Sequence, residues 1–588
     1  MKKEIEERYN LLFDTYSLEK PLEAPKVNLI IKESLQKFLS DAKKAAIYCN
    51  GGHTQMLMAD FICELKSVRY IIDNYSENLG KSGFKYIKDE EIETEKIDSV
   101  IISSFKFRKE IKESLREKHP RVRVLDIYDE FEKNQILLSA DYYYYNHPYH
   151  HYHTINWLQR NLNQESKCNE EKWLELITHY LHIKDFRSAS IKAEKLYRLT
   201  HNPTYQQLQS DILQLYQKEL EIAESLDRSN VIMFCFDGLR RMDLYGTQMP
   251  KIMKCLKKDS VLFENAYSCS TSTYESLVPA YSGNLDLRTG YFEKNYVNVE
   301  DCTFAKKVLQ NGNNFYVYGD MDHFIEGKDI QYCNQFQTVT EKIWNMLLDA
   351  ETERDSLFYL HELYESHFTF SNPYTVEEIK TEGTAMLFDY LPQKGGRLRV
   401  DYRKQHDDAL RYLDDVVAPF FEKMKCKMVI YADHGNLILD KETKIEEVGD
   451  LEFTCSAGWT EIPLLVRNSK MGTGTNDNLM SLSEIPNIIC ALLDDTNYVI
   501  PNREYIKIVR SELYNPDFRY LYNSLGKETY LNAFEAFVFE NGYKLIIFSN
   551  SEIELYNANE IKIRGNENLV KELIEQVKND ITVCDEFA

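Results

Sequence analysis

The sequence contains no run approaching the ~18 consecutive apolar residues that a membrane-spanning helix requires. The N-terminal segment MKKEIEERYNLLFDTYSLEK is charged throughout and lacks the apolar core of a secretory signal. The 12 cysteines show no repeated spacing, and several lie in strand-like apolar segments, as Cys235 does in VIMFCFD. We therefore expect no transmembrane segment, and a cytoplasmic location in which buried thiols stay reduced.

An excess of positive charge is also missing, since 71 Lys and Arg residues face 94 Asp and Glu residues, for a net charge of −23. Proteins that bind nucleic acid rely on clustered basic residues, so we expect no nucleic-acid partner. An acidic chain that handles an anionic group must concentrate positive charge locally, and a bound metal ion is one way to do so. Apolar residues make up 43% of the chain, which is typical of a well-cored globular protein.

Residues 1–145 are expected to form a small Rossmann-like domain, because strand and helix patterns alternate between residues 45 and 140. The turn CNGGHT carries Gly51 and Gly52, and Asp73 ends the next strand roughly 20 residues later, a distance typical of dinucleotide-binding folds. The full GxGxxG pattern is absent, however. Nucleotide binding, sugar recognition and a purely structural role all remain compatible with this segment.

Residues 146–228 predict a helical linker domain, since apolar residues recur at three- and four-residue intervals in segments such as EEKWLELITHYLHI. A histidine-rich tract precedes these helices, with His147, His150, His151 and His153 in DYYYYNHPYHHYHTINW. Such tracts can bind metal, but this one matches no fixed ligand spacing. An aromatic-rich join between domains is the favoured interpretation.

Residues 229–588 predict a second, larger α/β domain, with the strand-like segments VIMFCF, NFYVYGD, SLFYLHELY, CKMVIYA and EIPLLVRN. Ligands of open α/β sheets bind beyond the carboxyl ends of the strands. Asp237 follows the first of these strands, and Asp433 and His434 follow another, with Gly435 next to let backbone pass close to the site. An acid on one strand end and an acid–histidine pair on another indicate a site for a divalent metal.

The stretch ENAYSCSTSTYESLVPAYSG places five hydroxyl side chains just before a helical pattern. Thr273 is a poor nucleophile at its free pKa, but a nearby metal would lower that pKa, and a helix N-terminus favours an oxyanion or a phosphate. The alternative is that Ser272 or Thr273 is only an N-cap, with Glu275 or Ser276 completing the turn. The two interpretations are compatible.

Five segments in chain order, VIMFCFDGLRRMDLYG, STSTYESLVPAYSG, FYLHELYESHFTF, YADHG and EAFVFENGYKLIIFSNSEIELYNANE, resemble motifs of the alkaline phosphatase–sulfatase superfamily. More narrowly, they are similar to those of the phosphoethanolamine and phosphoglycerol transferases that modify bacterial glycans. The resemblance covers roughly residues 229–565. It implies an alkaline-phosphatase-like αβα sandwich, which the Rossmann-like domain and the helical spacer precede.

Carried over to these motifs, the resemblance implies one divalent metal, zinc or manganese, held by Asp237, Thr273, Asp433 and His434. Thr273 would attack phosphorus and become a phospho-threonine ester. His367 would hold the transferred group or protonate the leaving oxygen. An acceptor hydroxyl would then attack from the other side, so that two in-line steps give net retention at phosphorus.

The sequence departs from its relatives at three points. No C/S-x-P-x-R frame surrounds Thr273, which disfavours a sulfatase that uses formylglycine. No histidine lies between His434 and Trp459, so a second tight metal site is not expected. The transferase relatives are usually membrane-anchored and outward-facing, whereas no anchor is expected here.

These observations predict a cytoplasmic, metal-dependent transferase. It would move a phosphoramidate, phosphoglycerol or phosphoethanolamine group from an activated, possibly nucleotide-linked donor to a hydroxyl of a capsular or other surface polysaccharide. The composition is similar to that of the capsule O-methyl phosphoramidate transferases. A soluble phosphodiesterase or phosphatase with the same site is the alternative. An inactive scaffold is disfavoured, because every expected site position carries a competent residue.

Overall fold

In a computed structural model, the 588-residue chain forms two compact units. The structure describes residues 2–21, 24–50, 54, 57–58, 61–74, 84–104, 107–134, 148–165, 167–319, 324–333, 336–367, 370–376, 396–438, 449–514, 519 and 522–584. Unit 1 comprises Met1–Glu19, Ile155–Glu378 and Ala385–Ala588, and unit 2 comprises Lys20–Thr154 and Ile379–Thr384. Unit 2 is thus inserted into unit 1 near the start of the chain.

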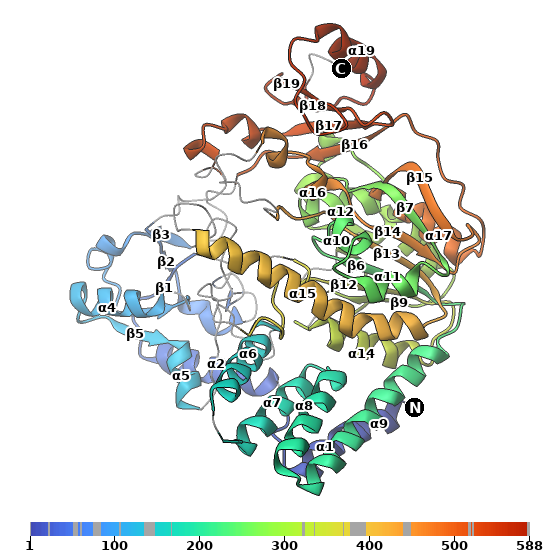
Figure 1. Cartoon of the computed structure of the whole chain (residues 1–588). Coiled ribbons are helices and arrows are strands. Elements are labelled where there is room, and N and C mark those ends of the chain that lie inside the picture. Colours follow the sequence, from blue (N-terminus) through green and yellow to red (C-terminus); the bar gives the residue numbers. More distant parts are fainter. Residues whose placement is uncertain are drawn as a thin grey trace. The chain divides into compact units, whose positions relative to one another are not determined.

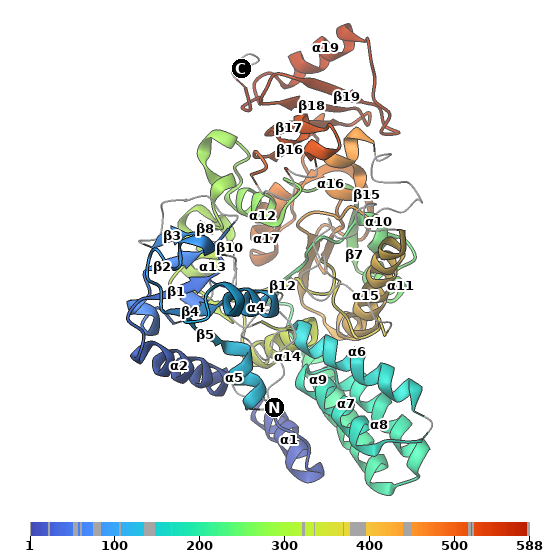
Figure 2. The same cartoon turned by 90° about the vertical axis from the view of Figure 1, so that its left-hand side faces the viewer.

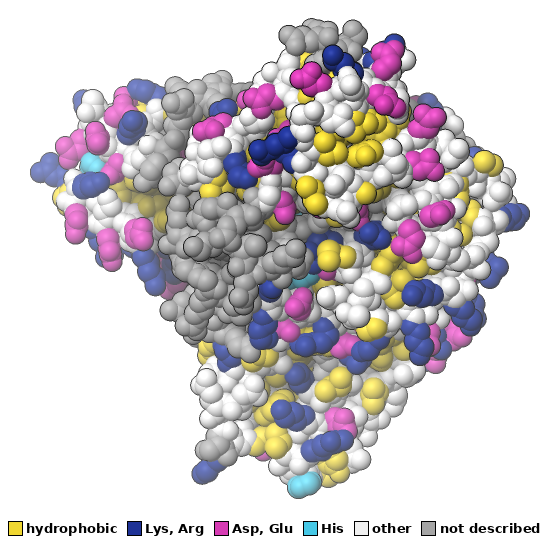
Figure 3. Space-filling model, turned by 45° about the horizontal axis from the view of Figure 1, so that its top comes forward, with side chains coloured by type: hydrophobic (Ala, Val, Ile, Leu, Met, Phe, Trp, Pro, Cys, Tyr) yellow, Lys and Arg dark blue, Asp and Glu magenta, His cyan; other side chains and the backbone are white. Residues whose placement is uncertain are grey.

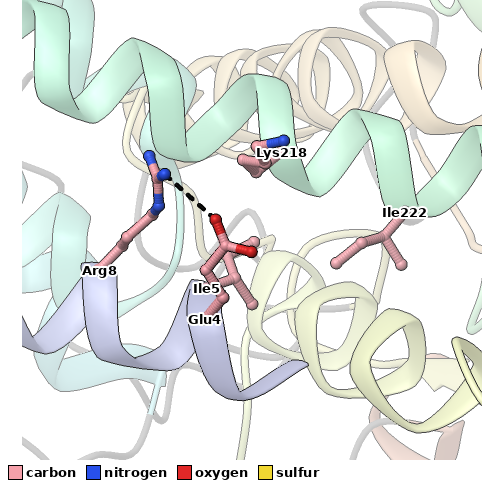
Figure 4. Close-up of a pocket in the computed structure, with 5 residues that line it drawn as sticks. All are labelled: Glu4, Ile5, Arg8, Lys218 and Ile222. Carbon is pink, nitrogen blue, oxygen red and sulfur yellow. Dashed lines mark ion pairs between the residues drawn. The ribbon is translucent and has the colours of Figure 1, made fainter. Parts of the chain in front are cut away.

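This grouping differs from the three expected domains, because the first helix and the helical segment both belong to unit 1. Helix α1 (Lys2–Tyr16) packs on α9 (Pro203–Ser225), and Figure 4 shows Glu4, Ile5 and Arg8 of α1 beside Lys218 and Ile222 of α9. Helix α9 in turn contacts α14 (Val339–Ala350) and α15 (Gly396–Lys423). Within unit 1, the helical segment is therefore connected through α9 to helices α14 and α15 of the large domain.

Unit 2 contains the predicted parallel sheet, with strand order β3-β2-β1-β4-β5. The strands are β1 (Ala45–Tyr48), β2 (Tyr70–Ile72), β3 (Lys85–Ile87), β4 (Ser99–Ile102) and β5 (Arg123–Asp126). Helices α2 (Ala24–Ser40), α4 (Arg108–Lys118) and α5 (Ile127–Lys133) accompany them. Asp73 accepts a hydrogen bond from the backbone N–H of Asn50 at 3.0 Å, so its carboxylate lies beside the turn after β1. Gly51 and Gly52 lie outside the described residues, and nucleotide binding stays a prediction.

The helices expected between residues 155 and 228 are present. They are α6 (Pro148–Gln164), α7 (Glu170–His182), α8 (Phe186–Thr200) and α9. Asn169, Asp185 and Asn202 accept backbone hydrogen bonds at the N-termini of α7, α8 and α9, as N-cap residues do. Of the histidine-rich tract, His147 and the side chain of His150 lie outside the described part.

The centre of unit 1 is an eight-stranded sheet with the order β11-β9-β12-β6-β13-β14-β7-β15. Its strands are β6 (Val231–Phe236), β7 (Ser260–Tyr267), β9 (Phe315–Tyr318), β11 (Gln331–Tyr332), β12 (Leu357–Glu362), β13 (Lys427–Ala432), β14 (Leu464–Arg467) and β15 (Gly474–Ser481). Strands β12, β6 and β13 are parallel neighbours and are buried along their whole length. Their continuous apolar runs reflect a sheet that helices cover on both faces.

Helices form the two outer layers of this sandwich, as expected. Figure 2 shows α11 (Pro250–Leu256) and α15 on one face of the sheet. On the other face lie α12 (Thr273–Ser282), α13 (Thr303–Gln310) and α17 (Ile485–Leu493) (Figure 2). The fold class of the C-terminal region is therefore the predicted αβα sandwich.

A smaller antiparallel sheet closes unit 1 (Figure 1). Its strands β16 (Tyr505–Arg510), β17 (Phe534–Phe539), β18 (Lys544–Phe548) and β19 (Ile553–Tyr556) pair in sequence order, and α19 (Glu567–Val577) follows. One face of this sheet packs with Tyr267 and Phe453, and the other packs with α19. Within the described residues, no helix is long and apolar enough to cross a membrane.

Candidate active site

The parallel register of three strands brings the predicted site residues to one edge of the large sheet. Phe236, Glu362 and Ala432, the last residues of β6, β12 and β13, lie opposite one another in the ladder. Asp237 and the pair Asp433–His434 follow immediately and therefore emerge at the same edge. This is the carboxyl edge at which ligands of open α/β sheets bind.

Thr273 is the first residue of α12 and directs its hydroxyl at these side chains. Its Oγ1 lies 3.2 Å from Oδ2 of Asp237 and 3.2 Å from Nε2 of His434. Ser272 occupies the N-cap position but makes no capping hydrogen bond through its side chain. Glu275 accepts a hydrogen bond from the Ser270 hydroxyl at 3.0 Å and does not complete a capping box. Ser272 is therefore the N-cap by position but not by a side-chain hydrogen bond, and the helix start presents Thr273 to Asp237 and His434.

Asp237 is completely buried at the centre of the cluster. His361 Nε2 lies 3.1 Å from its Oδ2, and His367 Nε2 and His434 Nε2 each lie 3.7 Å from its Oδ1. Burial alone would raise the pKa of Asp237, but the charge of His367 and the interaction with His361 outweigh that effect and lower it. The Asp237 carboxylate therefore stays ionised.

Asp433 keeps one carboxylate oxygen for the site. Its Oδ1 accepts hydrogen bonds from the backbone N–H groups of Gly238 at 2.9 Å and His434 at 2.8 Å. Oδ2 is buried, lies 3.4 Å from His434 Nε2, and accepts no hydrogen bond within the described part of the chain. Burial and the charge of Asp237 together raise the pKa of Asp433. A buried acceptor without a donor is the feature expected of a metal ligand.

His434 is oriented with Nε2 toward the cluster. Its Nδ1 lies 2.6 Å from the carbonyl oxygen of Gly435, which can only accept, so Nδ1 carries the proton and the neutral ring has its lone pair on Nε2. A Cβ atom at Gly435 would lie 2.0 Å from the carbonyl oxygen of Gly458. The expected close passage of backbone at Gly435 is confirmed.

The four predicted ligands thus lie together, and their atoms suit a divalent metal. Two carboxylates, one imidazole and one hydroxyl provide the mixed oxygen and nitrogen ligands that such ions take. Ligand atoms of Asp237, His367 and His434 lie within 4.8 Å of one another, as do those of Asp237, His361 and Asp433. The orphaned oxygen of Asp433 and the orientation of His434 both fit a bound cation.

His361 was missed by the sequence analysis. It lies on β12, is 2% exposed, and stacks edge-on against Phe324 at 4.9 Å. Burial opposes its positive charge, but the hydrogen-bonding interaction with Asp237 outweighs burial and raises the pKa of His361. The available signal was a histidine inside the apolar strand run FYLHE, where a buried polar side chain needs a partner.

His367 lies at the outer side of the cluster. Its side chain is 33% exposed, whereas that of Asp237 is fully buried. The Glu362 carboxylate accepts backbone hydrogen bonds from Glu365 at 2.8 Å and Ser366 at 3.2 Å, which fixes the loop before His367. The Ser366 hydroxyl donates to the carbonyl of Asp237 at 2.7 Å. His367 is therefore accessible to a substrate, whereas Asp237 is not.

Residues 229–495 match the family model described as Sulfatase. This part of the chain is a sulfatase-family domain. It belongs to the alkaline phosphatase and sulfatase superfamily, so the resemblance that the motifs predicted is confirmed. Enzymes of this superfamily act on phosphoryl or sulfate groups and bind a divalent metal, for which the sulfatase domain has candidate ligands.

Solved structures provide a further comparison for the sulfatase domain. The phosphonate monoester hydrolase of Agrobacterium radiobacter is 10% identical, with a TM-score of 0.44 over 60% of this chain and 95% of that one. The C-terminal periplasmic domain of EcEptC from Escherichia coli is 17% identical, with a TM-score of 0.31 over 44% and 79%. The PsFucS1 sulfatase from Pseudoalteromonas sp. is 12% identical, with a TM-score of 0.37 over 62% and 94%. A comparison with curated proteins gives no significant match.

Proposed function

We propose that the sulfatase domain is a transferase that uses Thr273 as its nucleophile. It would move a substituted phosphoryl group, such as phosphoramidate, phosphoglycerol or phosphoethanolamine, from an activated donor to a hydroxyl of a capsular or other surface polysaccharide. The supporting observation is the position of Thr273 Oγ1, 3.2 Å from both the Asp237 carboxylate and the His434 imidazole. Threonine in place of a formylglycine precursor favours phosphoryl chemistry over sulfate hydrolysis.

Asp237, Thr273, Asp433 and His434 would hold one divalent ion, zinc or manganese. When bound, such an ion supplies positive charge that lowers the pKa of a nearby hydroxyl and offsets the charge of the phosphoryl oxygens. Imidazole suits zinc and carboxylates suit manganese, so this mixed set accommodates either. A single cation at this edge would provide the local positive charge that the acidic chain otherwise lacks.

In the first step, Thr273 Oγ1 forms a bond to phosphorus, and the bond from phosphorus to the leaving oxygen of the donor breaks. The hydroxyl proton passes to solvent. His367, which is partly exposed and next to Asp237, would protonate the leaving oxygen. The partial positive charge at the N-terminus of α12 favours the anionic group near Thr273.

In the second step, a sugar hydroxyl attacks phosphorus, and the bond from phosphorus to Thr273 Oγ1 breaks. The acceptor proton passes to His367, and Thr273 Oγ1 takes up a proton from solvent, so both side chains return to their first protonation state. Two in-line displacements leave the configuration at phosphorus unchanged. A water molecule in the acceptor position would make the enzyme a phosphodiesterase, so exclusion of water distinguishes the two activities.

Intact-protein mass spectrometry tests the nucleophile. After a metal ion and a nucleotide-activated donor are added, we expect the mass of one transferred group on Thr273. Thr273→Ala should gain no mass and lose turnover by ~10³-fold or more, whereas Thr273→Ser retains a hydroxyl and should retain part of the activity. Turnover close to that of the unaltered protein in Thr273→Ala would disprove the proposal.

An acceptor experiment separates transfer from hydrolysis. Donor consumption is measured with and without a capsular oligosaccharide. A transferase consumes donor faster with the oligosaccharide and produces a phosphorylated glycan, and a rate that ignores the oligosaccharide indicates a hydrolase.

Metal content tests the ligand set directly. Asp433→Asn should lower the metal bound per chain, measured by mass spectrometry of the elements, because Oδ2 of Asp433 accepts no hydrogen bond from the residues that the structure describes. Thr273→Ala should retain most of the metal, since three ligands remain. Equal metal loss in both variants would contradict this assignment.

For the location, we propose the cytoplasm. None of the twelve cysteines, all of which the structure describes, forms a disulfide bond, in keeping with a reducing compartment. On the face shown in Figure 3, Lys and Arg side chains are interspersed with Asp and Glu, and no extended surface of one charge is visible among the coloured residues. This distribution supports a donor and an acceptor of small or neutral chemistry over a nucleic acid.

A further inference from the structure

A cavity lies in unit 1, apart from the candidate metal ligands around Asp237. Its volume is about 460 Å³, and its walls come from the C-terminal end of α12, the start of α17, and β16. This volume falls within the range of small-molecule sites, roughly 300–1,000 Å³. Thr273 begins α12 and Ser282 ends it, so the two sites lie about 15 Å apart along one ten-residue helix.

The lining of this cavity is rich in hydrogen-bonding groups. Leu285, Pro486 and Ile506 are its aliphatic members. The polar side chains include those of Ser282, Thr303, Ser481, Ser483, Asn487 and Asp580. Hydroxyl and amide groups both donate and accept, so the wall complements a ligand that does the same. A purely apolar ligand would leave these groups without partners, which costs free energy.

Both basic side chains in the wall already have carboxylate partners. Arg503 forms an ion pair with Glu484, and Lys507 forms one with Glu535 at 2.6 Å. Lys507 also donates to the carbonyl oxygen of Asp580 at 2.6 Å. A free phosphate or metal ion would have to compete with these pairs. A neutral ligand would find both cations and carboxylates fixed as hydrogen-bonding partners.

The polar groups of the cavity are held in place before any ligand binds. Glu484 is 6% exposed and accepts hydrogen bonds from Asn487 Nδ2 at 3.0 Å and from the Tyr498 hydroxyl at 2.7 Å. The Tyr505 hydroxyl donates to the Asp580 carboxylate. Prior ordering of this kind reduces the entropy that a ligand must overcome.

We propose that this cavity binds a neutral, hydroxyl-rich saccharide. Sugar hydroxyls match a wall of mixed donors and acceptors without net charge. The further assignment, that this sugar is a unit of the acceptor glycan remote from the reacting hydroxyl, rests on the proposed function. An oligosaccharide of several units is long enough to extend between sites at the two ends of α12.

Saturation-transfer NMR with the full chain tests binding. The probes are lactose, maltose and N,N′-diacetylchitobiose, with inorganic phosphate as a charged comparison. We expect at least one sugar to bind with a Kd of about 1 mM or lower. Ser483→Trp, which fills the cavity, should weaken that binding by about 10-fold or more. Ser469→Trp places the same bulk outside the cavity and should leave binding unchanged.

Asn487→Ala provides a second test, because it removes an exposed amide donor without adding bulk. It should raise the Kd of the same sugar about threefold or more. Thermal unfolding verifies that each variant is folded. The proposal is overturned if none of the three sugars binds, if phosphate alone binds and Ser483→Trp abolishes that binding, or if both cavity variants bind sugar like the unaltered protein.

The acceptor role is measured separately. Ser483→Trp should raise the KM for capsular oligosaccharide about 10-fold and leave donor hydrolysis within about twofold. Labelling of Thr273 without sugar binding would disprove the saccharide site and leave the proposed transferase intact. Sugar binding in a chain whose Thr273 is never labelled would support the saccharide site and disprove the proposed transferase.

Discussion

Ser276 joins two parts of the active site through one buried hydroxyl. Its Oγ donates to the carbonyl of Asp433 at 2.6 Å and accepts the backbone N–H of Cys269 at 3.2 Å. Ser276→Ala leaves both groups buried without a partner, which should lower the free energy of unfolding by ~1–3 kcal/mol. Because Thr273 lies one turn away, we also expect kcat for a small phosphodiester to fall about 10-fold.

Ser190→Ala is the matched control for Ser276→Ala. Ser190 is also a buried helical serine, and its hydroxyl donates to the carbonyl of Arg187 at 2.9 Å in α8. Denaturant titration and steady-state kinetics on both variants should show a stability loss in each and a turnover loss only in Ser276→Ala. Unchanged kcat in Ser276→Ala would mean that the hydroxyl has no positioning role.

Glu362 positions His367 through backbone hydrogen bonds. Glu362→Gln replaces one carboxylate oxygen by an amide NH₂ group, which cannot accept the hydrogen bonds that Oε2 receives from the N–H and the hydroxyl of Ser366. We expect kcat to fall about 10-fold or more with metal content unchanged, since the metal ligands are untouched. Glu353→Gln, a variant before the N-terminal end of β12, should behave like the unaltered protein. Loss of metal in Glu362→Gln would contradict a role limited to His367.

The sequence alone predicts part of this site for physical reasons. Asp237 and Asp433 each end an apolar run, and parallel strands bring such ends to one edge. His361 lies inside the apolar run of β12, and the periodicity of a strand does not predict which side chains will contact a given residue. The positions of Ser276 and Glu362 as supports depend on contacts between segments far apart in sequence, which no local pattern encodes.

At the scale of the element, α7 carries a buried histidine that makes stability depend on pH. His182 donates from Nε2 to the carbonyl of Glu19 at 2.8 Å and stacks on Phe13 at 5.7 Å. Burial lowers the pKa of His182 from 6.5 to about 3. Between these values the unfolded chain binds a proton that the folded chain excludes, so stability falls as the pH falls. By pH 5 the loss should reach ~2 kcal/mol.

Urea unfolding at pH 7 and pH 5 measures this effect. His182→Gln retains an amide donor for Glu19 but does not titrate, and should lose ~2 kcal/mol less stability between the two pH values. His201→Gln, at an exposed position after α8, should retain the full pH dependence. If His182→Gln and the unaltered protein lost the same stability between pH 7 and pH 5, other groups and not His182 would cause the pH dependence.

Residues 580–584, here called the C-terminal strap, complete the small sheet. Glu535 of β17 accepts backbone hydrogen bonds from Thr582 at 2.7 Å and Val583 at 3.1 Å, and Ile581 is 2% exposed. Removal of residues 580–588 should lower the free energy of unfolding by ~2–5 kcal/mol, measured by denaturant titration. Removal of residues 585–588 alone should have little effect, and equal stability of the two truncations would contradict a structural role for the strap.

Sequence patterns predict the buried elements better than the peripheral ones. Strands β6, β12 and β13 were expected because their runs are apolar throughout. Strand β15, with the sequence GTNDNLMS, lies at the sheet edge and shows neither alternation nor an apolar run. Strand β3 has only three residues. Both form because a neighbouring strand offers hydrogen bonds, and this tertiary effect overrides their weak propensity.

For the whole molecule, the inserted arrangement of unit 2 makes a prediction about truncation. All the proposed catalytic residues lie in unit 1. A chain in which a flexible Gly/Ser linker replaces residues 20–154 should therefore fold and cleave a small phosphodiester within about threefold of the normal rate. Its use of the true donor or acceptor should suffer more if unit 2 recognises either one.

Removal of residues 1–154 should have a harsher effect, because it also deletes α1. The ring centroids of Tyr9 and Trp344 lie 6.0 Å apart, and Phe13 is 1% exposed. The deletion therefore uncovers apolar surface in unit 1. We expect the free energy of unfolding to fall by ~3–5 kcal/mol, or the protein to be insoluble. Thermal unfolding and gel filtration measure these outcomes. If both deletions behaved alike, α1 would contribute nothing to unit 1.

The same arrangement affects the chain while it is being made. Helix α1 leaves the ribosome first, yet its partner α9 begins at Pro203 and Trp344 follows later still. At 5–20 residues per second, about 200 residues take roughly 10–40 s to synthesise. The Lys20–Thr154 part of unit 2 emerges within that interval, whereas the apolar side of α1 stays exposed to chaperones and to neighbouring nascent chains until translation has passed α9.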